Sequence, residues 1–180
     1  MSTVKVLNEI KDFLEKNVTP KIKLRLPNDK DITEYSLVNP KVHIGWVPPK
    51  EYLPPDVNFS VPCVVVGLDN GEDDNTDSSY NIRLTVVVYS QIFSPYSFIT
   101  NEQNHYSNFE GYVELLNLID LAKAKLRKDT IINKYVKIDS SIQWGMYEEQ
   151  PLPYWYGYMR FKVSNNSYPA ANLDSLLNNL

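Results

Sequence analysis

Two stretches of the chain repeat apolar residues every three or four positions, which is the spacing of an amphipathic helix. The first, Thr3–Asn17, places lysines and glutamates between its apolar positions and is followed by a Thr-Pro pair that ends it. The second, Asn108–Lys128, carries basic residues in its last turn, where they complement the helix dipole. Ser107 and Glu110 have the spacing of a capping box at its start. The pattern predicts two helices, of which the second is the longer.

Other stretches alternate apolar with polar residues, or are rich in β-branched and aromatic residues, as strands are. We expect strands at Lys21–Leu26, Lys41–Val47, Val61–Gly67, Tyr80–Ser90, Tyr135–Ile138, Ser141–Tyr147 and Tyr154–Val163. Two proline pairs in Pro48–Pro55 predict an extended segment, either a rigid connector or a strap docked on a neighbouring subunit. Ile92–His105 has no period and is expected to be a loop, and Asn172–Leu180 is compatible with a last short helix.

The order of these elements indicates the fold class. A helix, several strands, a long helix and a final strand pair predict an α+β domain with helices packed against a mostly antiparallel sheet. The 180 residues contain no repeat and no linker, so we expect one domain, 1–180.

An acidic, glycine-containing stretch, Leu68–Ser79, separates two of the expected strands. This arrangement predicts a long β-hairpin whose strands can be buried while its charged tip stays in water. The tip carries the carboxylates of Asp69, Glu72, Asp73, Asp74 and Asp77. A charged arm on a domain is suited to attracting or repelling a partner, so this stretch is the first candidate for an interface.

The overall composition excludes several classes of protein. A net charge of −4 argues against a general affinity for nucleic acid. One cysteine cannot form an internal disulfide. No apolar run approaches the ~20 residues that span a bilayer, and the first residues lack the apolar core of a signal peptide. We therefore expect a soluble protein of the cytoplasm that makes no membrane contact.

The sequence contains no motif that would carry catalysis. It lacks the glycine-rich phosphate loops, the serine nucleophile elbow and the paired histidines of zinc enzymes. Only His43 and His105 could act as bases near neutrality. Cys63 lies within a run of valines, where a small buried hydrophobic residue is the usual role, although a Cys63–His43 couple would need only proximity in the fold. We expect no enzyme, no catalytic residue and no cofactor.

The acidic stretch also fails as a calcium loop. Alternate positions carry oxygen ligands, namely Asp73, Asn75, Asp77 and Ser79. The expected glycine is Ser78, however, and the expected glutamate is Leu84. No metal site is predicted.

Aromatic residues leave one alternative open. The chain has 13 tyrosines against 6 glycines, and tyrosine suits both a β-rich core and a surface that becomes dry on assembly. The pair Glu148–Glu149 lies close in sequence to Trp144, Tyr147, Tyr154, Trp155 and Tyr156. Such aromatics would stack on a sugar in a glycosidase or carbohydrate-binding module, or on one another across paired strands.

Five segments together carry a likeness to a known family: Pro40–Trp46, Val61–Gly67, Arg83–Tyr89, Glu110–Leu116 and Pro151–Tyr158. The order of these segments, and the types of residue in them, resemble those of the tail terminator (tail completion) proteins of long-tailed phages and of phage-tail-like bacteriocins. The resemblance spans most of the chain and rests on no single invariant motif. It implies a twisted sheet with helices packed on one side, together with the long hairpin arm.

The function that the resemblance implies is structural. Such a protein forms a homohexameric ring that caps the tail tube, stops its polymerisation and offers a docking face, or collar, to the head or connector. In a contractile tail the ring also holds the sheath. Its expected place is the virion tail or tail-like particle, assembled in the cytoplasm of the bacterial host. DNA would pass through the lumen of a phage tail without sequence-specific binding.

A closed ring needs two different contact surfaces on each subunit. The candidates for contacts with a subunit or with the tube are Trp46, Tyr52, Trp144, Tyr147, Tyr154, Trp155 and Tyr156. We expect the acidic tip, with Glu72, Asp73, Asp74 and Asp77, to face either the lumen, where it would repel DNA phosphates, or an adjoining ring. Two alternatives remain: another connector or sheath-associated tail protein, and the carbohydrate-binding or hydrolytic module.

Overall fold

The structure is a computed structural model that describes residues 2–28, 34–46, 60–74, 77–91, 96–97, 102–103, 108–133 and 136–166. Its helices are α1 (Thr3–Asn17), the short 3-10 helix η1 (Thr19–Lys21) and α2 (Glu110–Lys128). Its strands are β1 (Leu24–Pro27), β2 (Tyr35–Val38), β3 (Lys41–Ile44), β4 (Cys63–Asp73), β5 (Asp77–Tyr89), β6 (Tyr96–Ser97), β7 (Glu102–Gln103), β8 (Ile131–Ile132), β9 (Val136–Met146) and β10 (Tyr154–Asn166).

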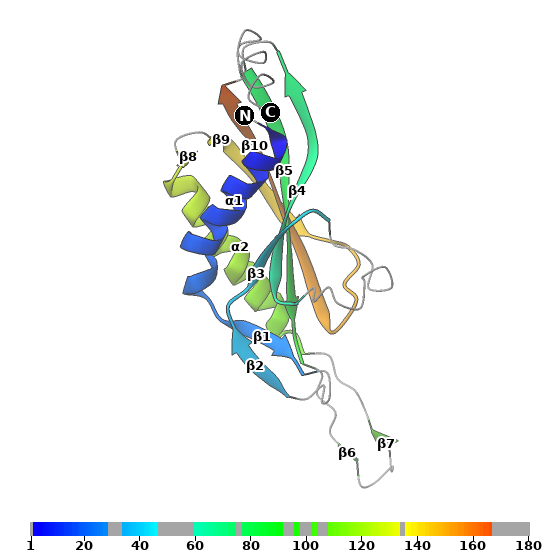
Figure 1. Cartoon of the computed structure of the whole chain (residues 1–180). Helices are drawn as coiled ribbons and strands as arrows, with labels where there is room; N and C mark the ends of the chain where they lie inside the picture. Colours follow the sequence, from blue (N-terminus) through cyan, green and yellow to red (C-terminus); the bar gives the residue numbers. More distant parts are fainter. Residues whose placement is uncertain are drawn as a thin grey trace, which may run out of the picture.

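Six of the strands form the main sheet, in the order β3-β4-β5-β10-β9-β8. Every neighbouring pair is antiparallel except β3 and β4, which are parallel. Figure 1 shows α1 and α2 side by side on the same side of this twisted sheet. The α+β fold with helices on one side of a mostly antiparallel sheet is therefore confirmed.

The core lies between the helices and the sheet. Because strand side chains alternate between faces, every second residue of the central strands enters this layer; on β10 these are Met159, Phe161 and Val163, each at most 4% exposed. They belong to the same core cluster as the apolar stripe of α2. Leu118 and Ile119 of this stripe are fully buried. Helix α1 packs mainly over β3 and β4. Burial of the apolar side chains of α1 and α2 against the sheet stabilises this packing.

Most of the acidic stretch forms strand, so the expectation that Leu68–Ser79 separates the two strands as a charged tip is wrong for most of its length. Strand β4 continues to Asp73 and β5 begins at Asp77. Strand β10 also continues along this region, pairing Asn166 with Asp77. The arm is thus three-stranded, and the ends of β4, β5 and β10 extend together beyond the helices in Figure 1. Two of the acidic side chains on these strands, Asp69 and Glu72, pair with cations of the neighbouring strands.

The predicted helices are confirmed, with one difference at a cap. Helix α1 has the expected bounds. Helix α2 begins at Glu110, whose backbone N–H donates to Asn108 Oδ1 at 2.8 Å. The carboxylate of Glu110 contacts Arg25 of β1. This ion pair holds the Glu110 side chain, and Ser107 lies outside the described residues.

Other differences concern strand ends. The two strands expected at Tyr135–Ile138 and Ser141–Tyr147 are one strand, β9, with an irregular register opposite Phe161 and Val163. The strand expected from Lys21 begins only at Leu24, because Lys21 belongs to η1. The expectations for Pro48–Pro55 and Asn172–Leu180 lie outside the described residues.

Candidate functional site

The face of the main sheet opposite α1 and α2, here called the open face, is covered by no helix of the described residues. Residues that alternate with the core positions lie here, among them Arg83 and Thr85 of β5 and Tyr156 and Arg160 of β10. A small apolar cluster of Cys63, Val65 and Val87 is buried on this face. The open face is therefore where polar and aromatic side chains gather.

A hollow of about 890 Å³ lies on the open face. We call it the open-face hollow; the lining residues that matter here are Trp46, Arg83, Tyr147, Glu148, Glu149 and Tyr156. Its size is that of a ligand or side-chain pocket, and its wall combines aromatic rings with a few charged groups. These residues come from the end of β3, from β5, from the β9–β10 connection and from β10.

Close backbone packing forms one wall of the hollow. A Cβ at Gly67 would lie 3.0 Å from the carbonyl oxygen of Gly45, so glycine lets the end of β3 pass close over β4. Gly45 has a φ of +126°, which glycine adopts readily. Trp46 follows directly and is 65% exposed. The Arg83 guanidinium stacks on its ring, 3.9 Å from the ring centroid.

The opposite wall is the connection between β9 and β10, and Gln150 fixes its shape. The Gln150 side chain donates to the carbonyl oxygen of Tyr156 at 3.0 Å and accepts from the backbone N–H of the same residue at 2.7 Å. It also donates to the carbonyl oxygen of Tyr147. Gln150 therefore bridges the strand ends, and leaves Glu148 and Glu149 exposed at the rim.

The charges of this region are unevenly matched. Neither Glu148 nor Glu149 forms an ion pair with another described residue. Arg83, by contrast, pairs with Asp69 at 3.2 Å. Burial raises the pKa of the Tyr156 phenol, so this side chain stays an uncharged hydroxyl at neutral pH. The hollow thus presents aromatic faces beside two uncompensated carboxylates.

The acidic arm is partly neutralised. Asp69 lies between Arg83 and Arg160, whose side-chain nitrogens are 3.2 and 3.5 Å from its carboxylate. Glu72 pairs with Lys162 across the arm at 3.5 Å. A polar hollow of about 450 Å³, lined in part by Asp69, Arg160 and Lys162, lies beside these pairs.

The four predicted tip residues do lie together at the end of the arm. Asp73 ends β4 and Asp77 begins β5. Asp74 follows Asp73, and its carboxylate accepts the backbone N–H of Asp77 at 2.8 Å. Glu72 lies one residue before Asp73 and opposite Ser79. No ion pair with a described residue compensates Asp73 or Asp77, so the charge of the arm is concentrated at its end.

The predicted aromatic candidates separate onto different surfaces. The hollow brings Trp46, Tyr147 and Tyr156 together. Tyr154 packs against Tyr89 instead, with ring centroids 5.8 Å apart. Tyr52 lies outside the described residues.

The two remaining candidates belong to the helix side of the sheet. Trp155 is only 6% exposed and packs beneath Phe109 and Tyr112, so this chain offers little of it to a partner. Trp155 is grouped with Tyr154 and Tyr156 by sequence proximity, but successive residues of a strand face opposite sides of the sheet. Trp144 is 46% exposed, and the Lys123 ammonium of α2 lies 4.2 Å from its ring centroid.

The candidate nucleophile and base show no sign of activation. Cys63 is fully buried, and burial raises its pKa to about 12. Burial and the nearby Lys41 and Lys11 lower the pKa of His43. The Cys63 thiol therefore stays protonated, which is the reverse of what a nucleophile needs. Within the described ranges, no three His, Cys, Asp or Glu side chains form a group that could hold a metal ion.

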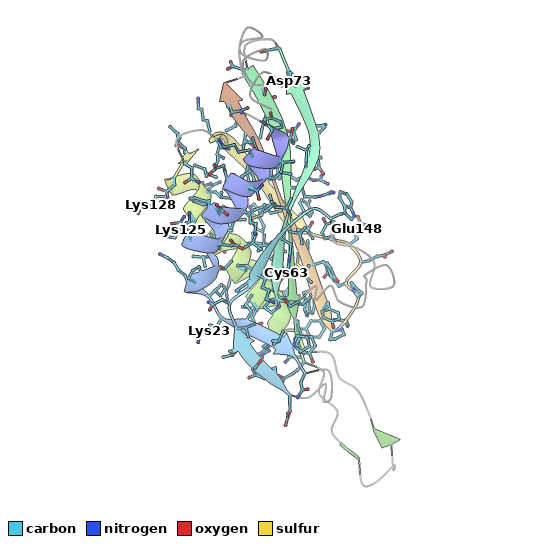
Figure 2. The ribbon with its side chains drawn as sticks, viewed as in Figure 1. Lys23, Cys63, Asp73, Lys125, Lys128 and Glu148 are labelled. Carbon is cyan, nitrogen blue, oxygen red and sulfur yellow. The ribbon has the colours of Figure 1, made fainter. Side chains whose placement is uncertain are left out.

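A cluster of lysines lies on the helix side of the domain. We call Lys21, Lys23, Lys125 and Lys128 the basic patch. Lys21 is adjacent to Lys125 and lowers the pKa of its ammonium group. Figure 2 shows Lys23, Lys125 and Lys128 on the side of the helices and Glu148 on the opposite side of the sheet. None of the four lysines forms an ion pair with another described residue.

Sequence reasoning missed the residues that organise the hollow, chiefly Arg83, Gln150 and Gly67. No motif marks them, because they act through strand register and backbone contacts between distant segments. Comparison with known proteins does not add to this picture: no family model matches the chain, and no curated protein matches it. No helix in the described part of the chain is long and apolar enough to cross a bilayer.

Proposed function

We propose that this chain is a structural protein of a phage tail or phage-tail-like particle. Copies of it form a ring, expected to be a homohexamer, that caps the tail tube and stops its polymerisation. The head-proximal side of the ring serves as a collar for the head or connector, and in a contractile tail it also holds the sheath. The protein acts by its shape and contacts, without a catalytic residue or cofactor.

The observation that supports a ring best is the separation of charge on the domain. In Figure 2, Lys23, Lys125 and Lys128 of the basic patch lie on the helix side and Glu148 lies on the opposite side of the sheet, where Glu149 also lines the open-face hollow. Two unlike, complementary surfaces on opposite sides favour head-to-tail association, which closes into a ring when the rotation per subunit is fixed. A surface that carried both charges evenly would not favour this arrangement.

An open strand edge supports a contact with the tube protein. Strand β8 pairs only with the beginning of β9, and in the described part of the chain no strand pairs with the outer edge of Ile142–Met146. This edge carries no charged residue or proline, the usual protections of an exposed edge. Partly exposed Trp144 adds apolar area beside it. An extended segment of a partner could extend the sheet here.

Electron microscopy and mass measurement of the purified protein test the proposal directly. We expect discrete rings with a central hole in negative stain, and a mass close to six times that of the 20.8 kDa chain. A chain that stays monomeric at high concentration, and turns over a small molecule, would overturn the proposal.

The acidic end of the arm has a separate test. Replacing Glu72, Asp73, Asp74 and Asp77 by Gln or Asn should leave the fold intact, because Asp73 and Asp77 form no ion pair with a described residue and the Glu72–Lys162 pair is exposed. We expect the variant to disturb tail completion or DNA passage, measured by microscopy of assembled particles and by delivery. Normal tails with normal delivery would remove this role.

One observation keeps a second candidate function open. The open-face hollow combines Trp46, Tyr147 and Tyr156 with two carboxylates, and aromatic rings with acidic groups also suit a carbohydrate. A monomer that binds soluble glycans, with loss of binding in Trp46→Ala, would favour a carbohydrate-binding module over a ring protein.

A further inference from the structure

We propose that the contact between neighbouring subunits is made by the basic patch of one copy docked on the open-face hollow of the next. This inference rests on the proposed ring and specifies its lateral interface. It assigns the donor side to Lys21, Lys23, Lys125 and Lys128, and the acceptor side to Trp46, Tyr147, Tyr156, Glu148 and Glu149. The partner is a second copy of this chain.

The donor side carries several positive charges close together, and Asp129 is a nearby carboxylate that acts on Lys125 in the opposite direction. Lys21 and Lys125 come from η1 and α2, and the packing of these elements brings their ammonium groups together. Like charges at this separation repel, and this repulsion would be relieved by carboxylates placed over them. Lys23 and Lys128 extend the patch and are exposed. The patch is therefore suited to an acidic partner.

The acceptor side has the complementary chemistry. The rim carries Glu148 and Glu149, which have no ion-pair partner among the described residues. Between them and Trp46 lies a space of about 890 Å³ with aromatic walls. Arg83 already stacks on Trp46 and pairs with Asp69, so the carboxylates of Glu148 and Glu149 and the rings of Tyr147 and Tyr156 are the groups that can stabilise a lysine ammonium. The hollow can thus receive the ends of lysine side chains.

The placement of the two surfaces sets the symmetry. They lie on opposite sides of the sheet, as Lys125 and Glu148 show in Figure 2. A two-fold dimer through either surface would bring lysine against lysine, or carboxylate against carboxylate, and like charges across an interface are costly. Contact of unlike surfaces repeats from copy to copy in one direction, as a ring requires.

Two charge-reversal variants test the contact. The acceptor variant is Glu148→Lys with Glu149→Lys, and the donor variant changes all four lysines of the basic patch, Lys21, Lys23, Lys125 and Lys128, to Glu. Each variant alone should remain monomeric, since its two surfaces then carry the same sign. Circular dichroism and urea unfolding check that both fold, and Lys5→Glu with Lys137→Glu serves as a matched reversal of two lysines outside the patch. This control should assemble as the unchanged protein does.

Mixing the two variants gives the decisive measurement. The reversed hollow of the acceptor variant now matches the reversed patch of the donor variant, and their unaltered surfaces also match each other. An equimolar mixture should therefore recover the mass of the complete ring, with alternating subunits. Assembly of both variants should also weaken as salt is raised, because exposed charges are screened over about 8–10 Å at physiological ionic strength.

The outcomes separate this inference from the proposed function. A monomeric unchanged protein would overturn the ring itself. Rings formed by the unchanged protein and by both single variants would overturn the lateral contact and leave the ring standing. Variants that fail alone and also fail when mixed would overturn the pairing of these two surfaces. Normal assembly of the donor variant, with loss of affinity for a double-stranded DNA oligonucleotide, would instead assign the patch to nucleic acid.

Discussion

The two faces of the main sheet are made by the same strands, yet they hold opposite kinds of side chain. Along β10, Met159 and Phe161 enter the core and are 0 and 4% exposed. Their neighbours Tyr158 and Arg160 lie on the open face, where the Arg160 side chain is 48% exposed. The helix face is close-packed and apolar, whereas the open face is aromatic, charged and hollowed.

This difference indicates where stability and recognition reside. Burial of apolar area on the helix face supplies most of the free energy of folding. Exposed ion pairs on the open face contribute little to it, typically less than about 1 kcal/mol each. The open face can therefore carry charges and a hollow for a partner at small cost to the fold. The predictions below test this division.

The largest effect is expected from neighbouring residues on β10. Met159→Ala should lower the free energy of unfolding by about 2–5 kcal/mol, because it leaves a cavity under α2. Arg160→Ala, one residue away on the open face, should cost less than about 1 kcal/mol. Urea unfolding followed by circular dichroism measures both. Equal losses for the two variants would contradict the division between the faces.

A half-buried ion pair should show an intermediate effect. Arg25 ties β1 to α2 through Glu110 and Glu114, with 3.3 Å between Arg25 and the Glu114 carboxylate. Arg25→Ala leaves Glu114 half-buried without its cation, and should destabilise by about 1–3 kcal/mol. The double variant with Glu114→Gln should recover part of this loss. Additive losses in the two variants would show that the pair does not interact.

The same pair predicts a pH dependence. Burial raises the pKa of Glu114, and Arg25 partly offsets the rise, so loss of Arg25 should raise this pKa further. A carboxyl group whose pKa is higher in the folded state than in the unfolded state costs stability as pH rises through its unfolded value. Arg25→Ala should therefore be more destabilising at pH 7 than near pH 4. Urea unfolding at the two pH values measures this difference.

A smaller effect is expected at the open-face ion pairs. Asp69→Asn removes the carboxylate between Arg83 and Arg160 and should cost less than about 1 kcal/mol, with the loss shrinking at high salt. Asp73→Asn is the matched control, because Asp73 forms no ion pair with a described residue. Salt-independent destabilisation of several kcal/mol would show that this pair supports the fold.

The smallest expected change is kinetic. Cys63 is buried under the open face with its pKa raised to about 12, so iodoacetamide should react with it very slowly at pH 8. In urea the exposed thiol should react at the rate of an ordinary cysteine. Mass spectrometry of the alkylated protein follows both rates. Rapid alkylation of the folded chain would place Cys63 at an accessible surface instead.

Sequence patterns were sufficient for the elements that bury an apolar stripe. The bounds of α1 and the course of α2 followed from helical spacing, and β10 followed from its aromatic and β-branched residues. The arm was harder to predict, because Asp69 and Glu72 were assigned to the exposed tip of the hairpin. Only the fold showed that Arg83, Arg160 and Lys162 accompany them and that β10 adds a third strand.

The candidate site was predictable only in part. Trp46, Tyr147 and Tyr156 were named as interface residues, but nothing in the sequence placed Trp46 beside the other two, since about 100 residues separate them. Trp155 was grouped with its sequence neighbours although it faces the core. Contacts between distant segments depend on strand order, which a single sequence does not encode in any local pattern.

The sequence by itself determined which segments are helices and strands and that helices pack on a sheet, because hydrophobic periodicity acts over a few residues. Tertiary structure alone decided which charges are paired and which aromatics meet in one hollow. It also decided that the basic patch and the carboxylates lie on opposite sides of the domain. Those relations depend on register, twist and strand order, through which residues far apart in the chain become neighbours.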